Sequence, residues 1–251
     1  MSGKRENTAL LARSASPRMN LAHYEPLSLS DFPERLATTV FTTGCNMACP
    51  YCHNPELVHV SEATPRLDEE EFFAFLERRR KRLNGVCVTG GEPALQPGLP
   101  DFIRRIRATG YAVKLDTNGS YPDVLLALLT EGLLDYVAMD VKAPLTRYAE
   151  FGAREGTDAK VKSSIDILGA STVRHEFRTT APPLLLHEED LMGIAALLPA
   201  GSHYVLQDFV ATKVLDASLA SARGYGVRDL LAIASSIGSR FPALDVRTRN
   251  A

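Results

Sequence analysis

Three of the four cysteines in this sequence stand close together, at Cys45, Cys49 and Cys52. Iron–sulfur clusters are normally held by four cysteine thiolates, so three thiols at the spacing Cys-x3-Cys-x2-Cys are one ligand short. A metal site with three protein ligands leaves one position open, which is typical of a catalytic site and not of a structural one. The spacing therefore predicts a cluster with one iron free to bind another molecule. The fourth cysteine, Cys87, is predicted to be a buried strand residue.

Two other kinds of site would use the same cysteines. A zinc site would need a fourth ligand, such as His53 or His59, and the sequence lacks the second pair of ligands that zinc knuckles usually carry. A redox pair would consist of Cys49-Pro50-Tyr51-Cys52, which resembles the thioredoxin motif but leaves Cys45 without a role. The cluster accounts for all three cysteines, and the other two sites stay open as alternatives.

Length and composition favour a globular protein of the reducing cytoplasm. With 251 residues, 45% of them hydrophobic and 23% charged, the chain can bury a full core as one α/β domain. A net charge of −2 gives no electrostatic reason to expect nucleic acid or an anionic membrane as a partner. No apolar run is long enough to span a membrane, and the first residues lack the apolar segment of a secretory signal. We therefore expect a cytoplasmic protein, where clustered cysteines are more often ligands than disulfides.

Strand-like and helix-like segments alternate along the sequence. Residues 1–22 are predicted to be a flexible lead and residues 23–251 a single domain. β-branched and apolar runs predict strands over 36–43, 86–89, 112–116, 136–141, 173–179, 204–209 and 243–246. Amphipathic patterns predict helices over 68–83, 99–109, 123–131, 158–168, 188–198 and 227–237. We therefore expect about six βα units with parallel strands, which is a partial TIM-type barrel, with a doubly wound sheet as the competing fold.

Polar motifs lie at or just beyond the carboxyl ends of the predicted strands. They are the cysteine loop, the turn Gly90-Gly91-Glu92, the stretch Asp116-Thr117-Asn118-Gly119, the pair Asp140 and Lys142, and Arg178. In parallel α/β folds, ligands bind at this edge of the sheet. The sequence therefore predicts that separate strand ends converge on one site.

Two of these motifs in combination resemble the radical S-adenosylmethionine superfamily. One is the cysteine spacing with an aromatic residue, Tyr51, before the last cysteine, and the other is Gly90-Gly91-Glu92-Pro93, which resembles the superfamily's GGE motif. Residues 43–57, 115–119 and 139–142 resemble the activases of glycyl radical enzymes within it. The resemblance runs from about Tyr24 to Leu215. It is strongest to activating proteins of anaerobic ribonucleoside-triphosphate reductase, with pyruvate formate-lyase activating enzymes as near neighbours.

This resemblance implies two cofactors. Cys45, Cys49 and Cys52 would hold a 4Fe–4S cluster, and the amino and carboxylate groups of S-adenosylmethionine would chelate its fourth iron. Reductive cleavage of the sulfonium would then yield methionine and a 5′-deoxyadenosyl radical. The cofactor carries this chemistry, while the protein supplies position and electrostatics.

The strand-end motifs would then hold S-adenosylmethionine. Backbone groups of Gly90 and Gly91 would bind its ammonium, because glycine lets a backbone approach a ligand closely, and Glu92 would support the turn. Lys142 and Arg178 would be cationic partners of its carboxylate or ribose hydroxyls. Further cofactor contacts are expected from Tyr51 beside the adenine and from Asp116, Asn118, Asp140 and Gln207.

Oxygen groups at two neighbouring strand ends point to a further cation. In pyruvate formate-lyase activases, the residues that match Asp116, Thr117 and Asp140 bind a monovalent cation beside the cofactor, which suits hard oxygen ligands. The family pattern also has a methionine that falls on Ala138 here, where only a backbone oxygen can replace it. A purely structural interpretation stays open, in which Asp116 and Asn118 form the turn.

The resemblance also implies a partner protein. The enzyme would abstract a hydrogen atom from a backbone glycine of anaerobic ribonucleoside-triphosphate reductase, with a flavodoxin-type protein as electron donor. The alternative is a radical S-adenosylmethionine enzyme acting on another glycyl radical enzyme such as pyruvate formate-lyase, a peptide or a small molecule. A simple iron–sulfur electron carrier is a third interpretation, but such a carrier needs no cofactor cleft.

Overall fold

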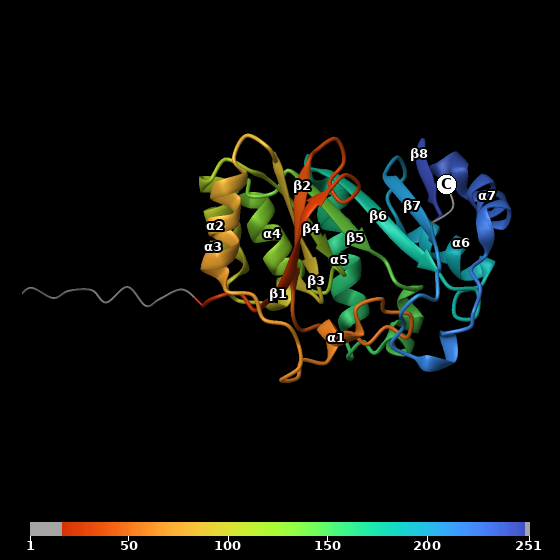
Figure 1. The fold of residues 1–251 in the computed structure, drawn as a ribbon. Helices are drawn as coiled ribbons and strands as arrows, with labels where there is room; N and C mark the ends of the chain where they lie inside the picture. The colour runs from red at the N-terminus through yellow and green to blue at the C-terminus, as the bar shows by residue number, and fades with distance from the viewer. Residues whose placement is uncertain (1–16, 249–251) are drawn as a thin grey trace, which may run out of the picture.

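Eight strands form one open sheet in the computed structural model of the chain, which describes residues 17–248 (Figure 1). β1 pairs antiparallel with β2, and β2 to β8 pair in parallel. The edge strands β1 and β8 are not neighbours in the sheet, so the barrel does not close. The strands follow sequence order: β1 (Leu21–Ser28), β2 (Ala37–Thr42), β3 (Gly85–Gly90), β4 (Ala112–Thr117), β5 (Tyr136–Asp140), β6 (Arg174–Ala181), β7 (His203–Asp208) and β8 (Ala243–Arg247).

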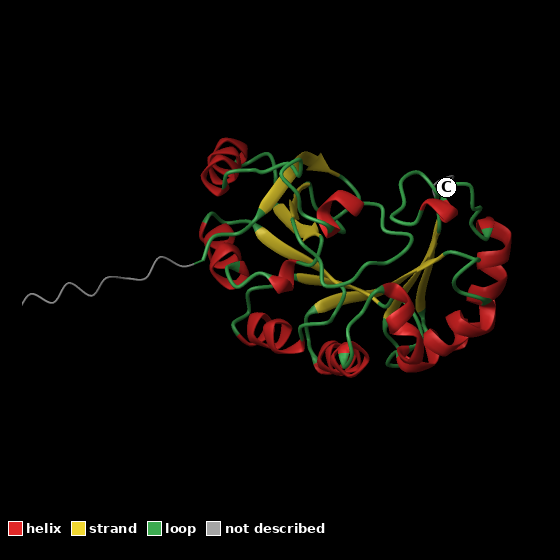
Figure 2. Ribbon diagram, turned by 90° about the horizontal axis from the view of Figure 1, so that it is seen from below, coloured by secondary structure: helices red, strands yellow, loops and turns green. Residues whose placement is uncertain are grey.

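Helices connect the parallel strands and lie along the outer side of the curved sheet (Figure 2). Counted from β2, the chain contains six βα units before β8, so the predicted partial TIM-type barrel is confirmed. The helices are α1 (Pro55–Val58), α2 (Glu69–Arg79), α3 (Leu99–Ala108), α4 (Pro122–Thr130), α5 (Thr157–Ala170), α6 (Glu188–Leu197) and α7 (Gly226–Ile237), with 3-10 turns at Pro93–Leu95, Leu145–Phe151, Ala217–Leu219 and Gly238–Arg240. Within residues 17–248, none of the helices has the length and apolar character needed to cross a membrane.

Helix α2 illustrates how the sequence forms these elements. The Asp68 side chain caps the helix by accepting hydrogen bonds from the backbone N–H groups of Glu70 and Glu71. One face of α2 is buried through a run of aromatic and aliphatic side chains, and the rings of Phe72 and Phe75 pack on Tyr24 of β1. The helix ends earlier than the predicted residue 83, and Lys81 adopts a positive φ of 72° just beyond its end.

The ordered fold begins before residue 23, where the sequence placed the start of the domain. Met19 is buried, and Leu21 is the first residue of β1, a strand that the sequence pattern did not predict. The predicted boundary therefore falls inside β1. The part of the predicted lead over residues 1–16 lies outside the described residues.

Candidate functional site

A pocket of about 260 Å³ lies at the carboxyl edge of the parallel strands. Residues at or just beyond the carboxyl ends of six successive strands form its wall, from the cysteine loop after β2 to the end of β7. The structure thus brings together every predicted site residue except Glu92: Cys45, Cys49, Tyr51, Cys52, Gly90, Gly91, Asp116, Thr117, Asn118, Asp140, Lys142, Arg178 and Gln207.

Sequence reasoning missed several residues of the pocket wall. Thr89 and Thr180 stand near the ends of β3 and β6, so the strand-end rule that selected their neighbours could have found them. The others lie in or just after the cysteine loop, up to the end of α1, and were not assigned to the cofactor site: Met47, His53, Asn54 and Val58.

The cysteine loop has no regular structure and is held by backbone hydrogen bonds from distant segments. The Ala48 N–H donates to the carbonyl of Phe151 (3.1 Å), which follows β5. The Asp216 N–H, which follows β7, donates to the carbonyl of Pro50 (2.8 Å). These contacts fix the loop across the mouth of the barrel, so the thiols are held in place by the rest of the fold.

The Gly90-Gly91 turn packs directly on the start of the cysteine loop. The Gly91 N–H donates to the Thr42 carbonyl and the Glu92 N–H donates to the Gly44 carbonyl, both at 2.9 Å. A Cβ on Gly90, whose φ is +120°, would lie 2.3 Å from the Thr42 nitrogen, and one on Gly91 would lie 2.1 Å from the Gly44 oxygen. The two glycines are therefore required by the approach of one loop to another, in addition to any ligand that the turn faces.

The three clustered cysteines are free thiols. Cys49 is buried, whereas Cys45 and Cys52 are partly exposed. Burial raises the pKa of the Cys45 thiol to about 11 and that of Cys49 to about 12. Both are protonated near neutral pH in the metal-free protein, so binding a metal centre as thiolates releases protons.

Glu92 lies beneath the pocket and joins two of its turns. Its carboxylate accepts hydrogen bonds from the Ala94 N–H (3.0 Å), the Thr117 hydroxyl (2.8 Å) and the Asn118 N–H (2.7 Å). Complete burial raises its pKa to about 7, against the opposing effect of these donors. Glu92 thus ties the turn after β3 to the turn after β4.

The Asn118 side chain connects the turn after β4 to the cysteine loop. Its Nδ2 donates to Asn46 Oδ1 (3.1 Å) and lies 4.0 Å from Cys45 Sγ. Asn46 Nδ2 in turn donates to the Ser120 hydroxyl (2.9 Å). Amide groups are therefore fixed beside one of the three thiols, a contact that the sequence pattern did not reveal.

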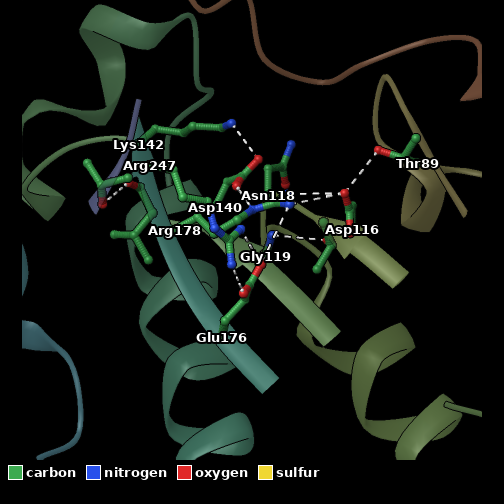
Figure 3. A network of polar contacts seen from close by, with 12 residues as sticks. Thr89, Asp116, Asn118, Gly119, Asp140, Lys142, Glu176, Arg178 and Arg247 are labelled. Carbon is green, nitrogen blue, oxygen red and sulfur yellow. Dashed lines mark hydrogen bonds and ion pairs between the residues drawn. The ribbon is translucent and has the colours of Figure 1, made fainter. Parts of the chain in front are cut away.

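A network of charges forms the opposite side of the pocket (Figure 3). Arg178 donates from Nε to Asp140 Oδ1 (2.7 Å) and from its terminal nitrogens to Asp116 Oδ2 (3.2 Å). Lys142 donates to Asp140 Oδ2 (2.9 Å), and Lys114 pairs with Asp116 from below. Burial alone would raise the pKa of both carboxyls, but Arg178 and the neighbouring lysines hold their pKa values below the usual range.

The oxygen groups predicted to bind a monovalent cation are engaged within the protein. Asp116 and Asp140 face the side-chain cations just described, and the Thr117 hydroxyl donates to Glu92. Ala138 is buried and is the sheet partner of Asp116. A cation at this place would have to share both carboxylates with Arg178.

The two alternatives to a cluster need different local structures. A zinc site needs ligands that lie close together, and a thioredoxin-like redox pair normally opens a helix. Within the described residues, no three histidine, cysteine, aspartate or glutamate side chains come close enough to hold a single metal ion. The Nε2 of His53 lies 2.9 Å from the carbonyl oxygen of Val210. Cys49 and Cys52 belong to a turn in which the Cys52 N–H donates to the Cys49 carbonyl (2.9 Å), and α1 begins only at Pro55.

Tyr51 and Gln207 complete the predicted set. The Tyr51 ring is buried and meets Phe151 edge to face at 5.9 Å, and its hydroxyl has no hydrogen-bond partner in the part of the chain that the structure describes. Gln207 stands near the carboxyl end of β7. Both line the pocket on the side of the cysteine loop and β7.

Among the proteins similar in sequence are enzymes with three different names. The chain is 36% identical over 188 residues to the putative glycyl-radical enzyme activating enzyme of Methanocaldococcus jannaschii, covering 73% of this chain and 77% of that protein. It is 35% identical over 121 residues to the 7-carboxy-7-deazaguanine synthase of Methanopyrus kandleri, covering 41% of this chain and 47% of that protein. It is 32% identical over 127 residues to the pyruvate formate-lyase-activating enzyme of Clostridium pasteurianum, covering 47% of this chain and 50% of that protein.

The fold is also similar to a solved structure. QueE from Escherichia coli superposes with a TM-score of 0.53 at 12% identity, covering 92% of this chain and 93% of that chain. At so low an identity the likeness concerns the fold alone. It agrees with the open, mostly parallel sheet.

The family assignment rests on the region that carries the motifs. The Radical SAM superfamily model matches residues 39–198, which include the three clustered cysteines, the Gly90-Gly91-Glu92 turn and Arg178. The match spans more than half of the chain, and the relative from Methanocaldococcus jannaschii supports it over most of both chains. The resemblance inferred from the sequence is thereby confirmed, and this chain belongs to the radical SAM superfamily of enzymes.

Proposed function

We propose that this protein is an activase that generates a glycyl radical on a partner enzyme, and that the partner is anaerobic ribonucleoside-triphosphate reductase. The observation that carries the proposal is the 36% identity to a glycyl-radical enzyme activating enzyme along most of both chains. The partial likeness to a pyruvate formate-lyase-activating enzyme supports the same class of reaction.

The pocket fits the two cofactors that such an activase needs. A 4Fe–4S cluster held by Cys45, Cys49 and Cys52 would supply the electron that cleaves S-adenosylmethionine. The fit of the thiols rests on their common place in one pocket wall, their free state and the amides fixed beside Cys45. The iron–sulfur cluster is thus proposed from the chemistry of the donors present.

The charged side of the pocket suits the amino-acid part of S-adenosylmethionine. Lys142 and Arg178 offer two cations to its carboxylate, with Asp140 between them to limit the excess positive charge. The turn Gly90-Gly91 offers backbone groups to its ammonium, and Glu92 supports that turn from below. We assign the ribose to Asp116, Asn118 and Asp140, and the adenine to the side of Tyr51 and Gln207.

A macromolecular substrate fits the shape of the barrel. The sheet stays open between β1 and β8, which leaves a route by which a protein loop can reach the pocket. Among the described residues, the one cysteine besides Cys45, Cys49 and Cys52 is the buried Cys87, so these residues form no second cysteine cluster. We include a flavodoxin-type electron donor in the same proposal. We also place the protein in the reducing cytoplasm, since the thiols must stay reduced.

A monovalent cation beside the cofactor is also part of the proposal, on the condition that it can share Asp116 and Asp140 with the neighbouring side-chain cations. Three side-chain cations already face Asp116 and Asp140, so a bound potassium ion would add a fourth positive charge to two carboxylates. Titration of the reaction with potassium, at constant ionic strength, tests whether the ion contributes.

A second candidate is radical chemistry on a small molecule, as in the 7-carboxy-7-deazaguanine synthases. It is favoured by the 35% identity to one such enzyme, although that alignment spans about half of the relative. The two candidates share the cofactors and differ in the molecule that loses a hydrogen atom.

The test is an anaerobic incubation of the reconstituted, reduced protein with S-adenosylmethionine and an anaerobic ribonucleoside-triphosphate reductase. We expect 5′-deoxyadenosine and a glycyl doublet in the electron paramagnetic resonance spectrum of the partner. Formation of 5′-deoxyadenosine without the doublet, for this reductase and for pyruvate formate-lyase, would favour the second candidate. No 5′-deoxyadenosine at all would contradict both.

A further inference from the structure

A second layer of charge lies beneath the pocket and includes the last strand. Glu176 of β6 is 1% exposed and lies outside the pocket wall. Arg247 of β8 donates to both of its carboxylate oxygens, at 2.7 and 3.2 Å, and the Tyr136 hydroxyl donates to one of them (3.2 Å). A buried carboxylate is thus held by an arginine from a strand beyond the region of the family match.

Arg178 stands between this layer and the pocket (Figure 3). On the pocket side it donates to Asp140 (2.7 Å) and Asp116 (3.2 Å). On the opposite side its nearest guanidinium nitrogen lies 3.9 Å from Glu176 Oε1, beyond hydrogen-bond distance. Two sets of carboxylates therefore compete for one guanidinium, and in the structure the pocket side holds it.

We propose that Arg247 is a positioning residue for S-adenosylmethionine binding. By occupying both oxygens of Glu176, Arg247 leaves Arg178 free to face Asp116 and Asp140 at the pocket. The last strand of the sheet thereby sets the charged side of the pocket without touching it. This inference rests on the proposed function, because that function places the carboxylate of S-adenosylmethionine beside Arg178.

The consequence of losing Arg247 follows from burial. Glu176 would keep the Tyr136 hydrogen bond but would lack its cationic partner, and an uncompensated buried carboxylate is strongly unfavourable. The nearest permanent cation is then Arg178, since His203 lies 4.0 Å away and is charged only when protonated. A small rotation would bring Arg178 onto Glu176 and away from Asp140.

The test compares Arg247→Gln, Glu176→Gln and the double variant at pH 8. In Arg247→Gln we expect the KM for S-adenosylmethionine, measured by 5′-deoxyadenosine formation without partner, to rise about tenfold with kcat nearly unchanged. Glu176→Gln removes the competing carboxylate and should leave KM within about twofold. The double variant should therefore recover most of the loss, although it lacks both side chains.

A second readout needs neither cluster nor S-adenosylmethionine. The Arg178 Nε–H, bonded to Asp140, should give a distinct nitrogen–proton NMR signal in the metal-free protein. The signal should move in Arg247→Gln and return toward its original position in the double variant. Asp245→Asn is the matched control on β8, the strand of Arg247, because it removes only the 2.9 Å contact of Asp245 with His203 of β7, and neither the signal nor KM should change.

The results for the three variants distinguish a positioning role of Arg247 from a purely structural one. If the ion pair only stabilises β8, both single variants lose thermal stability, the double variant loses at least as much, and KM stays unchanged in all three. That result, or an Arg178 signal that stays in place in Arg247→Gln, overturns the inference. Arg178→Met serves as the reference for the proposed function: if it too leaves KM unchanged, the placement of S-adenosylmethionine is wrong and not only the role of Arg247.

Discussion

The two sides of the pocket are held in place by different forces. On the cysteine side, the loop after β2 and the turn after β3 pack backbone against backbone, with no room for a Cβ at Gly91. On the charged side, the ends of β4, β5 and β6 meet through ion pairs centred on Arg178. The cysteine side is therefore sensitive to small changes in volume, whereas the charged side is sensitive to the balance of charge.

The largest expected effect comes from adding one methyl group on the cysteine side. In Gly91→Ala the new Cβ would lie 2.1 Å from the Gly44 oxygen, so the cysteine loop must move. We expect a loss of about 3 kcal/mol in the free energy of unfolding and failure to retain iron after reconstitution. Urea unfolding and iron analysis measure the two effects.

Gly238→Ala is the matched control for that substitution, since no other part of residues 17–248 comes within 4 Å of its Cβ position and its φ is −59°. It should keep normal iron content. If Gly91→Ala also binds iron normally, the backbone contact does not hold the cysteine loop.

On the charged side, Asp140→Asn should weaken S-adenosylmethionine binding and leave the cluster intact. The substitution removes the carboxylate that orders Arg178 and Lys142, so we expect the dissociation constant to rise about tenfold or more. Equilibrium binding to the reconstituted protein measures it. Asp135→Asn, which breaks the Arg107 ion pair near the other end of β5, should bind as the wild type does. Loss of iron in Asp140→Asn would mean that the two sides are not independent.

Glu92 joins the two sides, and its buried carboxyl should make the free energy of unfolding depend on pH. Its pKa is about 7 in the folded protein and about 4.5 in the unfolded chain, so the folded state binds the extra proton between these values. Its contribution to the free energy of unfolding therefore decreases as pH rises through this window, by up to about 3 kcal/mol. Urea unfolding of the metal-free protein at pH 5 and pH 7.5 measures the change. Glu92→Gln should remove that part of the slope, and an unchanged slope would contradict the assignment.

The smallest expected effect is that of potassium. Because three side-chain cations already face Asp116 and Asp140, we expect potassium to change the rate of S-adenosylmethionine cleavage by less than about twofold, at constant ionic strength. A larger stimulation would mean that the ion displaces one of these side chains.

The cysteine side could be predicted from sequence because its information is local. Three cysteines at fixed spacing and the Gly90-Gly91-Glu92 turn each occupy a few consecutive residues, and parallel strands bring their ends to one edge of the sheet. The sequence suggested that the glycines face a ligand. It could not show that they admit the Gly44 backbone, because that contact joins segments far apart in the chain.

The charged side was predicted only in part, because its contacts also join segments far apart in the chain. Asp116, Asp140 and Arg178 stand at strand ends and were found, but their mutual ion pairs depend on the register of β4, β5 and β6. Glu176 and Arg247 carry no motif, and their contact spans 71 positions of the chain. Strand β1 was missed because its alternation is broken by Pro26 and by irregular pairing with β2.

The most direct test of the two-sided site is the electron paramagnetic resonance spectrum of the reduced cluster, with and without S-adenosylmethionine, in the wild type and in Arg178→Met. We predict that both proteins give the same spectrum without S-adenosylmethionine, because the cysteine side does not depend on Arg178. On adding a concentration that saturates the wild type, the wild-type spectrum should change and that of Arg178→Met should not. An identical change in both proteins, or loss of the cluster signal in Arg178→Met, would contradict the account.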